Sequence, residues 1–209
     1  LNEAVGLAYT ATTVANWGGT NPTSVRNALD ILAAGVNSVS NRTVGSFYRT
    51  VTQPVSSDCN SSYMQYEASP ILSDGVSVSG VGFDTVTVTN PGSYNIQFSA
   101  QIQKVSGQPS NILIWLEING TPVPWSNTDI NIQGNSQYLV AAWNWLVPLK
   151  AGDSFKIATH NGSNTSSINL VADAAPLAGP NIPSVILSVV QESTYVPPAS
   201  SGGSSSSSF

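Results

Sequence analysis

The chain has 209 residues and a mass of 21.7 kDa, enough for one well-packed domain of ordinary size with some peripheral segments. Only 8% of its residues are charged, against roughly 25% in a typical soluble domain. The formal net charge is −5 and the six basic residues are scattered, so we expect no nucleic-acid partner. No apolar run approaches the roughly 20 residues that cross a bilayer, so we also expect no membrane span.

The weak surface charge predicts a chain that is covered by other protein. Mean hydropathy is +0.04, whereas a monomer normally stays soluble by means of a charged surface. Cys59 is the one cysteine, so no disulfide within the chain can replace packing and association. Because the chain begins with Leu1, we expect a processed protein or a piece of a longer one. We therefore predict an obligate oligomer or a lattice component.

The first helix signal lies at Asn21-Pro22, where Asn21 can cap a helix and Pro22 suits its first position. Gly35 provides a C-terminal stop, which predicts a helix over roughly residues 22–34. Apolar side chains follow at the spacing of a short coiled-coil seam: Val25, Leu29, Leu32, Val36 and Val39. An amphipathic helix packed on its own domain is the alternative.

From residue 46 onward the pattern has a period of two. The clearest strand is 93–104, where Tyr94 and every second residue to Ile102 are apolar and the residues between them are polar. Turn signals separate further strands, which we expect near residues 47–52, 75–79, 82–89, 111–118, 137–147, 154–160, 167–172 and 183–191. We therefore predict three regions: an N-terminal helical attachment segment over 1–45, a β domain over 46–192 and a Pro/Ser-rich extended tail over 193–209.

Two of these strands, 112–116 and 183–190, are apolar on both faces, so each face needs a cover. A neighbouring subunit can supply it, helped by an aromatic-rich strand near residue 143; a loop of the same chain is the alternative. The predicted subunit interface comprises Val25, Leu29, Leu32, Val36, Trp115, Tyr138, Trp143, Trp145, Ile186 and Val190.

Three motifs carry a family resemblance: Pro91 to Phe98 leading into the alternating strand, Ile114 to Val123 around an Asn-Gly hairpin, and Leu149 to Phe155 around a Gly-Asp turn. With the closing strand 183–190, their order and spacing resemble the C1q/TNF-like fold over roughly residues 75–192. The resemblance is closest to the C1q-like modules of tailed-phage structural proteins. It implies an all-β, antiparallel jelly-roll sandwich that forms trimers, here with a short N-terminal helix and extended termini.

A second resemblance lies near the N-terminus. The segment from Ala15 to Ala34, with a tryptophan-glycine turn before a short helix, is similar to one that recurs in bacteriophage fibre and virion proteins. It covers about 20 residues and favours a phage over spore-surface or animal proteins with the same head, since no Gly-X-Y stalk is present.

Residues for chemistry are sparse. His160, the one histidine, adjoins an Asn-Gly turn and is expected in an exposed loop, and Cys59 has no signature of an activated nucleophile. Asp58 to Asn60 and Asp129 to Asn131 offer alternating oxygens but lack the rest of a calcium loop. We predict no catalytic residue, no cofactor and no metal. Trp125, between two strands, is the best candidate for an exposed tryptophan that contacts a sugar.

These observations predict a non-enzymatic virion protein on the particle surface, a homotrimeric capsid decoration or short head fibre. Its partners would be other copies of itself and virion proteins such as the capsid shell or a fibre base. One alternative is a receptor-binding tip of a tail fibre, in which loops 120–130 and 161–167 contact a host surface glycan. A weaker alternative is a secreted or spore-surface C1q-like adhesin.

Overall fold

The computed structural model describes residues 17, 22–40, 42–57 and 61–194, without the side chains of 37–40. The chain divides into two compact units, Leu1–Arg42 and Thr43–Phe209. The Ser-rich tail beyond residue 194 and the Asp58 to Asn60 segment lie outside the described residues.

The first unit contains α1 (Val25–Ser40). The helix begins three residues after the expected start, and Ser24 caps it: the Asn27 amide donates to Ser24 Oγ at 3.1 Å. The predicted end at Gly35 was wrong. Gly35 does not adopt the positive φ of a glycine stop, and the helix continues to Ser40.

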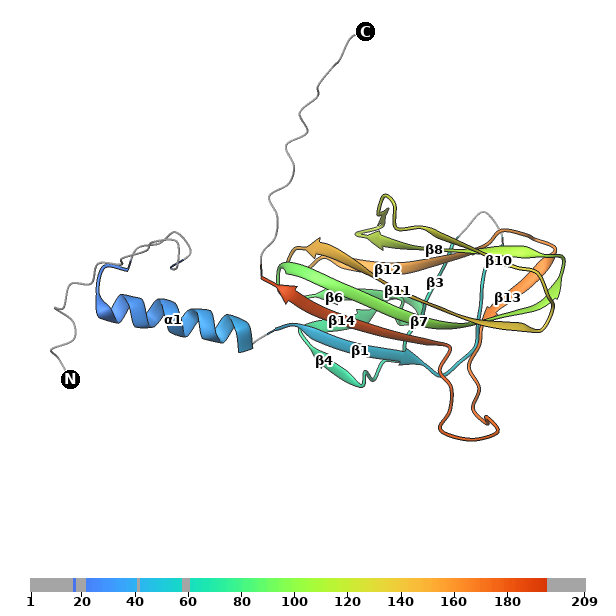
Figure 1. The fold of residues 1–209 in the computed structure, drawn as a ribbon, viewed down its shortest axis with the longest axis horizontal. Coiled ribbons are helices and arrows are strands. Elements are labelled where there is room, and N and C mark those ends of the chain that lie inside the picture. Colours follow the sequence, from blue (N-terminus) through green and yellow to red (C-terminus); the bar gives the residue numbers. More distant parts are fainter. Residues whose placement is uncertain (1–16, 18–21, 41, 58–60, 195–209) are drawn as a thin grey trace, which may run out of the picture. The chain divides into compact units, whose positions relative to one another are not determined.

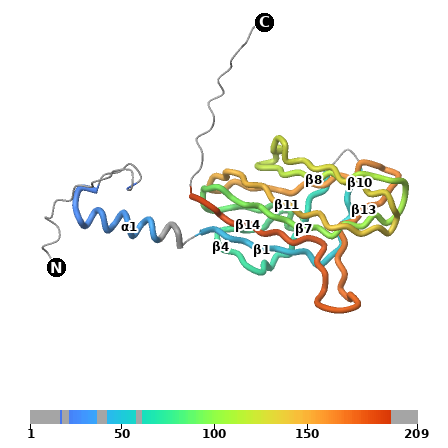
Figure 2. The backbone as a smooth tube through the Cα atoms, in the orientation of Figure 1, coloured from blue at the N-terminus to red at the C-terminus, as the bar shows by residue number. Residues whose placement is uncertain are grey.

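The second unit is an antiparallel sandwich of two sheets (Figures 1 and 2). The first sheet runs in the order β2-β13-β7-β14-β1-β4, and β11 pairs with the other edge of β7. Its strands are β1 (Val44–Arg49), β2 (Gln53–Pro54), β4 (Leu72–Asp74), β7 (Gly92–Gly107), β11 (Gln137–Leu149), β13 (Ser166–Leu170) and β14 (Val185–Ser193).

The second sheet runs in the order β10-β8-β12-β6-β5, with β3 on β12 and β9 on β8. Its strands are β3 (Ser62–Tyr63), β5 (Val76–Ser79), β6 (Thr85–Val88), β8 (Ser110–Ile118), β9 (Thr121–Pro122), β10 (Thr128–Ile132) and β12 (Ser154–Asn161). A short 3-10 turn, η3 (Val81–Phe83), joins β5 to β6.

The chain crosses repeatedly between the sheets: β7 and β11 lie in the first sheet, while β8 and β12, which follow them, lie in the second. The first and last strands are neighbours, with Val44 opposite Val190. Crossing between two packed antiparallel sheets is the connectivity of a jelly roll. The predicted all-β, antiparallel jelly-roll sandwich with a short N-terminal helix is therefore confirmed.

The core lies between the two sheets and follows the predicted alternation. Along β7 the side chains of Tyr94, Ile96, Phe98 and Ile102 are buried, and they face buried residues of the second sheet such as Leu116. Burial of each such side chain stabilises the fold by about 1.5–3 kcal/mol relative to its exposure to water. The outward faces of the two sheets therefore remain for contacts beyond the core.

Candidate functional site

The outward face of the first sheet lacks charged side chains over most of its width. Across the described strands β11, β7 and β14 the register places Leu146, Asn95 and Val190 in one row, and Ala142, Ser99 and Ile186 in another. The outward residues of β11, β7 and β1, and those of β14 up to Val190, are all uncharged. We call this surface the uncharged face.

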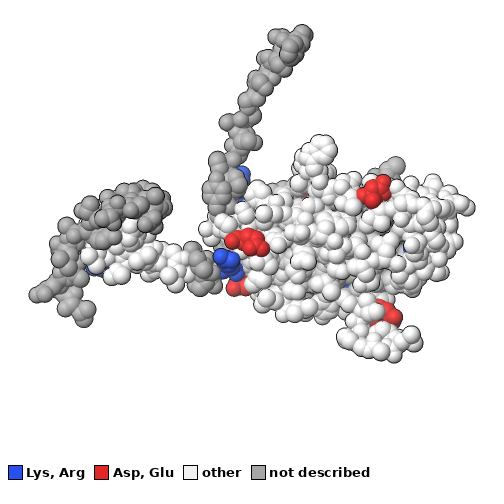
Figure 3. All heavy atoms as spheres, in the orientation of Figure 1, with Lys and Arg blue, Asp and Glu red and all other residues white. Residues whose placement is uncertain are grey.

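Large apolar side chains stand on this face without a cover. Leu146 is 67% exposed, Tyr138 is 63% exposed and Val140 is 57% exposed, all on the outer strand β11. In the view of Figure 3, charged side chains form only isolated spots on the sandwich. An apolar patch without charges is typical of a surface that contacts other protein.

A hollow of about 600 Å³ adjoins the uncharged face where β1 and β14 meet the 173–183 loop. Tyr48 and Ile186 form its strand wall, and Pro180 to Pro183 form its loop wall. The loop is held closed by two backbone hydrogen bonds between Asp173 and Ile182, of 2.9 and 2.8 Å. Most of the surface that lines the hollow is apolar.

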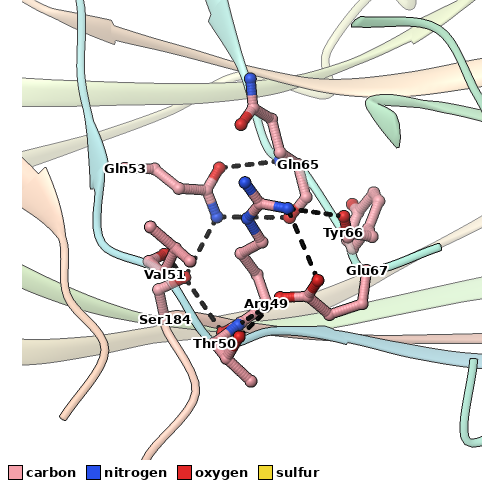
Figure 4. Close-up of polar contacts among 8 residues, drawn as sticks. All are labelled: Arg49, Thr50, Val51, Gln53, Gln65, Tyr66, Glu67 and Ser184. Carbon is pink, nitrogen blue, oxygen red and sulfur yellow. Dashed lines mark hydrogen bonds and ion pairs between the residues drawn. The ribbon is translucent and has the colours of Figure 1, made fainter. Parts of the chain in front are cut away.

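A polar network fixes the end of β1 beside this hollow (Figure 4). Arg49 Nη1 donates to the Tyr66 carbonyl at 3.1 Å and lies 3.7 Å from the Glu67 carboxylate. Gln53 Nε2 donates to Ser184 Oγ at 3.1 Å, and Ser184 Oγ donates to the Val51 carbonyl at 2.9 Å. These bonds tie Val51, just after β1, and Gln53 of β2 to Ser184, which directly precedes β14.

Glu67 is the titratable group of this network. The Thr50 hydroxyl and the Thr50 backbone amide both donate to Glu67 Oε1, at 2.7 and 3.0 Å. These hydrogen bonds, with a smaller contribution from Arg49, lower the pKa of Glu67 below its ordinary value near 4.5, although partial burial opposes them. Glu67 is consequently a structural carboxylate that is ionised at neutral pH.

A second hollow, of about 300 Å³, lies on the outward face of the other sheet. Its walls come from β8, β12 and the segment between β9 and β10: Leu113, Trp115, Pro122, Val123, Asn127 and His160. The register places Trp115 opposite Ala158 and Leu113 opposite His160. We call it the Trp115 hollow.

The structure separates the predicted interface residues into different surfaces. Tyr138, Ile186 and Val190 stand on the uncharged face, whereas Trp115 stands on the outward face of the other sheet. The two strands that are apolar on both faces belong to different sheets. One flat neighbour therefore cannot cover both of them, which the sequence alone did not reveal.

Trp143 and Trp145 point toward the core side of β11. The Phe98 ring lies 4.6 Å from the Trp143 ring in an edge-on arrangement and 5.4 Å from the Trp145 ring in a stacked one. Both indoles pack against the hydrophobic core. Core packing thus accounts for these two aromatic residues without a neighbouring subunit.

The helical part of the predicted interface lies in the first unit. Leu29, Leu32 and Val36 are 60%, 53% and 67% exposed, while Val25 is half-buried and Ala28 is buried. Exposed apolar side chains at heptad spacing are available for helix association. The role of this seam stays a prediction.

The structure also gives the positions of the candidate residues for ligand contact and chemistry. Trp125 is fully exposed at the tip of the segment between β9 and β10. The expectation for His160 was wrong: it is half-buried on β12, which continues to Asn161, and it lines the Trp115 hollow. Part of the predicted 120–130 loop is strand, in β9 and β10.

Two further features concern the described part of the chain. It contains no group of three or more His, Cys, Asp or Glu side chains that could hold a metal ion. Its helix is also too short and too polar to cross a membrane.

Comparison with known proteins gives a likeness of fold. No protein-family model and no curated protein matches the sequence. Among solved structures, murine APRIL matches with 16% identity and a TM-score of 0.45, over 72% of this chain and 98% of that one. The globular domain of the zebrafish complement 1qA protein matches with 14% identity and a TM-score of 0.43, over 75% and 99%. At these identities the likeness concerns fold alone.

Proposed function

We propose that the chain is a non-catalytic structural protein of a bacteriophage particle, which assembles as a homotrimer through the uncharged face. The observation that carries the assembly is this face itself, where Tyr138, Val140 and Leu146 stand exposed on a strand without outward charges. Burying such a face takes no ion out of water. Association through it therefore keeps the whole favourable free energy of burying apolar surface.

The hollow beside the uncharged face supports the same assembly. Its walls include Tyr48, Ile186 and the 180–183 segment; they are mainly apolar, with the charged Asp173 among them, and they adjoin the outward rows of β1 and β14. A closed three-fold ring uses two different patches on each subunit, a protruding one and a receiving one. The exposed edge strand β11 is the protruding patch, and the hollow is the receiving one.

The phage assignment is supported by the resemblance of residues 15–34 to a segment of phage fibre and virion proteins. In this proposal the N-terminal segment attaches to the capsid shell or a fibre base. The sandwich then projects from the particle surface as a capsid decoration or short head fibre. Function of this kind consists of burial, symmetry and repeated display rather than catalysis.

Light scattering of the full chain at micromolar concentration tests the assembly. The expected mass is that of three chains, and it should fall to one chain in Val140→Lys, which places a charge on the uncharged face. The matched control is Val81→Lys, which places the same charge on an exposed valine of η3, beside the other sheet, and should remain trimeric. A wild-type mass of one chain would refute the trimer.

Receptor binding at a tail-fibre tip is the second candidate, and the fully exposed Trp125 favours it. Imaging of labelled chains on phage particles separates the two positions. Label on the capsid supports decoration or a head fibre, whereas label at the tail tip supports receptor binding.

A further inference from the structure

The Trp115 hollow combines an apolar wall with two polar side chains at one small site. Leu113, Pro122 and Val123 contribute to a lining that is almost wholly apolar, and Asn127 and His160 line it with little polar surface open to the hollow. At about 300 Å³, it lies at the lower end of the range for small-molecule sites, roughly 300–1,000 Å³. A single ring-sized group fits such a space.

The Trp115 indole is held in one orientation. Its Nε1 donates to Glu117 Oε1 at 3.0 Å, and Glu117 is only 7% exposed. Lys156, opposite Glu117 on β12, lies 3.2 Å from Asp84 Oδ2 and 4.4 Å from the centre of the Tyr63 ring. Because the indole donor is already used, the aromatic face remains as the part of Trp115 that can contact a ligand.

Trp125 is presented at the same edge of the sheet at a conformational cost. Its φ is +65°, a left-handed conformation that is strained for a bulky residue. The next residue anchors the turn: Ser126 Oγ donates to the Val123 carbonyl at 2.8 Å, and the Leu116 amide donates to Ser126 Oγ at 3.1 Å. The fold thus holds a fully exposed indole beside the residues that wall the hollow.

A row of carboxamides continues from the hollow along β8 and β10. Asn111 Nδ2 donates to Asp129 Oδ2 at 2.9 Å, and Asn131 Nδ2 donates to Asn111 Oδ1. Asp129 is opposite Leu113, which lines the hollow. Amide groups both donate and accept, as hydroxyl groups do, while the carboxylates of Asp129 and Glu117 disfavour an anionic ligand.

We propose that the Trp115 hollow binds one neutral sugar residue of a glycan. The apolar face of the sugar ring lies against the Trp115 indole, and its hydroxyl groups bond to Asn127 and His160. Trp125 contacts the next residue of the glycan at the rim. The site is formed within one chain, so the proposal goes beyond the assembly and does not depend on it.

A glycan array probed with the full chain, followed by calorimetric titration of a neutral oligosaccharide from the array, tests this proposal. Trp115→Leu should weaken binding by roughly two- to tenfold, because the aromatic face that contacts the sugar ring is lost. Trp125→Ala should weaken binding to oligosaccharides while leaving monosaccharide binding unchanged. The control Leu177→Ala, on the 173–183 loop, should bind as the wild type does.

Three results would overturn the proposal. They are the absence of binding to any neutral glycan, binding confined to anionic glycans, and equal affinity in wild type and Trp115→Leu. Circular dichroism of each variant shows that it is folded. His160→Ala provides a second test that leaves the aromatic wall intact, and it should weaken the same glycan without changing the mass measured by light scattering.

Discussion

Two buried tyrosines provide a matched test of the core, because only one has a hydrogen-bond partner among the described residues. The Tyr94 hydroxyl donates to the Asn90 carbonyl at 2.6 Å. The Tyr66 hydroxyl is buried and has no partner in the described part of the chain. Burial raises the pKa of the Tyr66 hydroxyl well above its ordinary range, so it is neutral and pays only the desolvation of a dipole.

The variants Tyr66→Phe and Tyr94→Phe should therefore shift stability in opposite directions. Removing the Tyr94 hydroxyl loses one hydrogen bond and leaves the Asn90 carbonyl unpaired, which costs about 1 kcal/mol or more. Removing the Tyr66 hydroxyl should raise the free energy of unfolding by about 1 kcal/mol, because this group is buried without a partner among the described residues. In a domain of this size, each corresponds to roughly 2–4 °C in the melting temperature.

Calorimetric melting of both variants and the wild type, at one protein concentration, measures this difference. Equal concentration matters because association would add to the apparent stability. We expect the melting temperature of Tyr66→Phe to be higher than that of wild type and that of Tyr94→Phe to be lower. A Tyr66→Phe variant that melts below Tyr94→Phe would refute the assignment of the unpaired hydroxyl.

Three further predictions concern polar groups. Lys104→Ala should lower the free energy of unfolding by about 3 kcal/mol in chemical denaturation, because a buried side chain that donates to the Gly107 carbonyl at 2.8 Å is lost. The pKa of Glu67 is lower in the folded chain than in the unfolded chain. The free energy of unfolding should therefore fall as the pH drops below the pKa of Glu67 in the unfolded chain and through its pKa in the folded chain. In the variant Glu67→Gln, the stability measured by unfolding after pH jumps should depend less on pH. Ser24→Ala should cost the helix about 1 kcal/mol, visible as lost helical circular dichroism.

The sequence predicted the long strands well because their alternation is strong. The strand expected over 93–104 is β7 (Gly92–Gly107), and its predicted apolar face is the buried one. The strands β2, β3 and β9 have two residues each, too few to show a period. β2 and β3 are defined by pairing with β13 and β12, which are distant in the chain, and no local pattern reports such pairing.

The helix ends were predicted less well because several residues there can serve as caps. Asn21 and Ser24 are both good N-cap types, and the Ser24 hydroxyl accepts the Asn27 backbone amide at the start of the helix. Gly35 resembles a stop in sequence, yet glycine is also tolerated inside a helix at a cost of about 1 kcal/mol. The helix therefore continued past the residue that was expected to end it.

The candidate site depended on strand order, which the sequence does not contain. Trp115 and Trp143 look alike in sequence, but β8 and β11 lie in different sheets, so one indole faces a hollow and the other the core. His160 precedes an Asn-Gly turn, and only the length of β12 places it beside Trp115. Non-local pairing is what brings these residues together.

Placing the two candidate surfaces on different sheets leads to a prediction that links them. If copies associate through the uncharged face, the Trp115 hollows of the copies remain open and act together on a surface that displays many glycans. Val140→Lys should then keep the affinity of a single hollow for a soluble oligosaccharide, while apparent affinity for a glycan-coated surface falls by about 10²-fold or more. Calorimetry with the soluble sugar and surface plasmon resonance on the coated surface measure the two quantities. If Val140→Lys lost affinity equally in both measurements, the uncharged face and the Trp115 hollow would be one site.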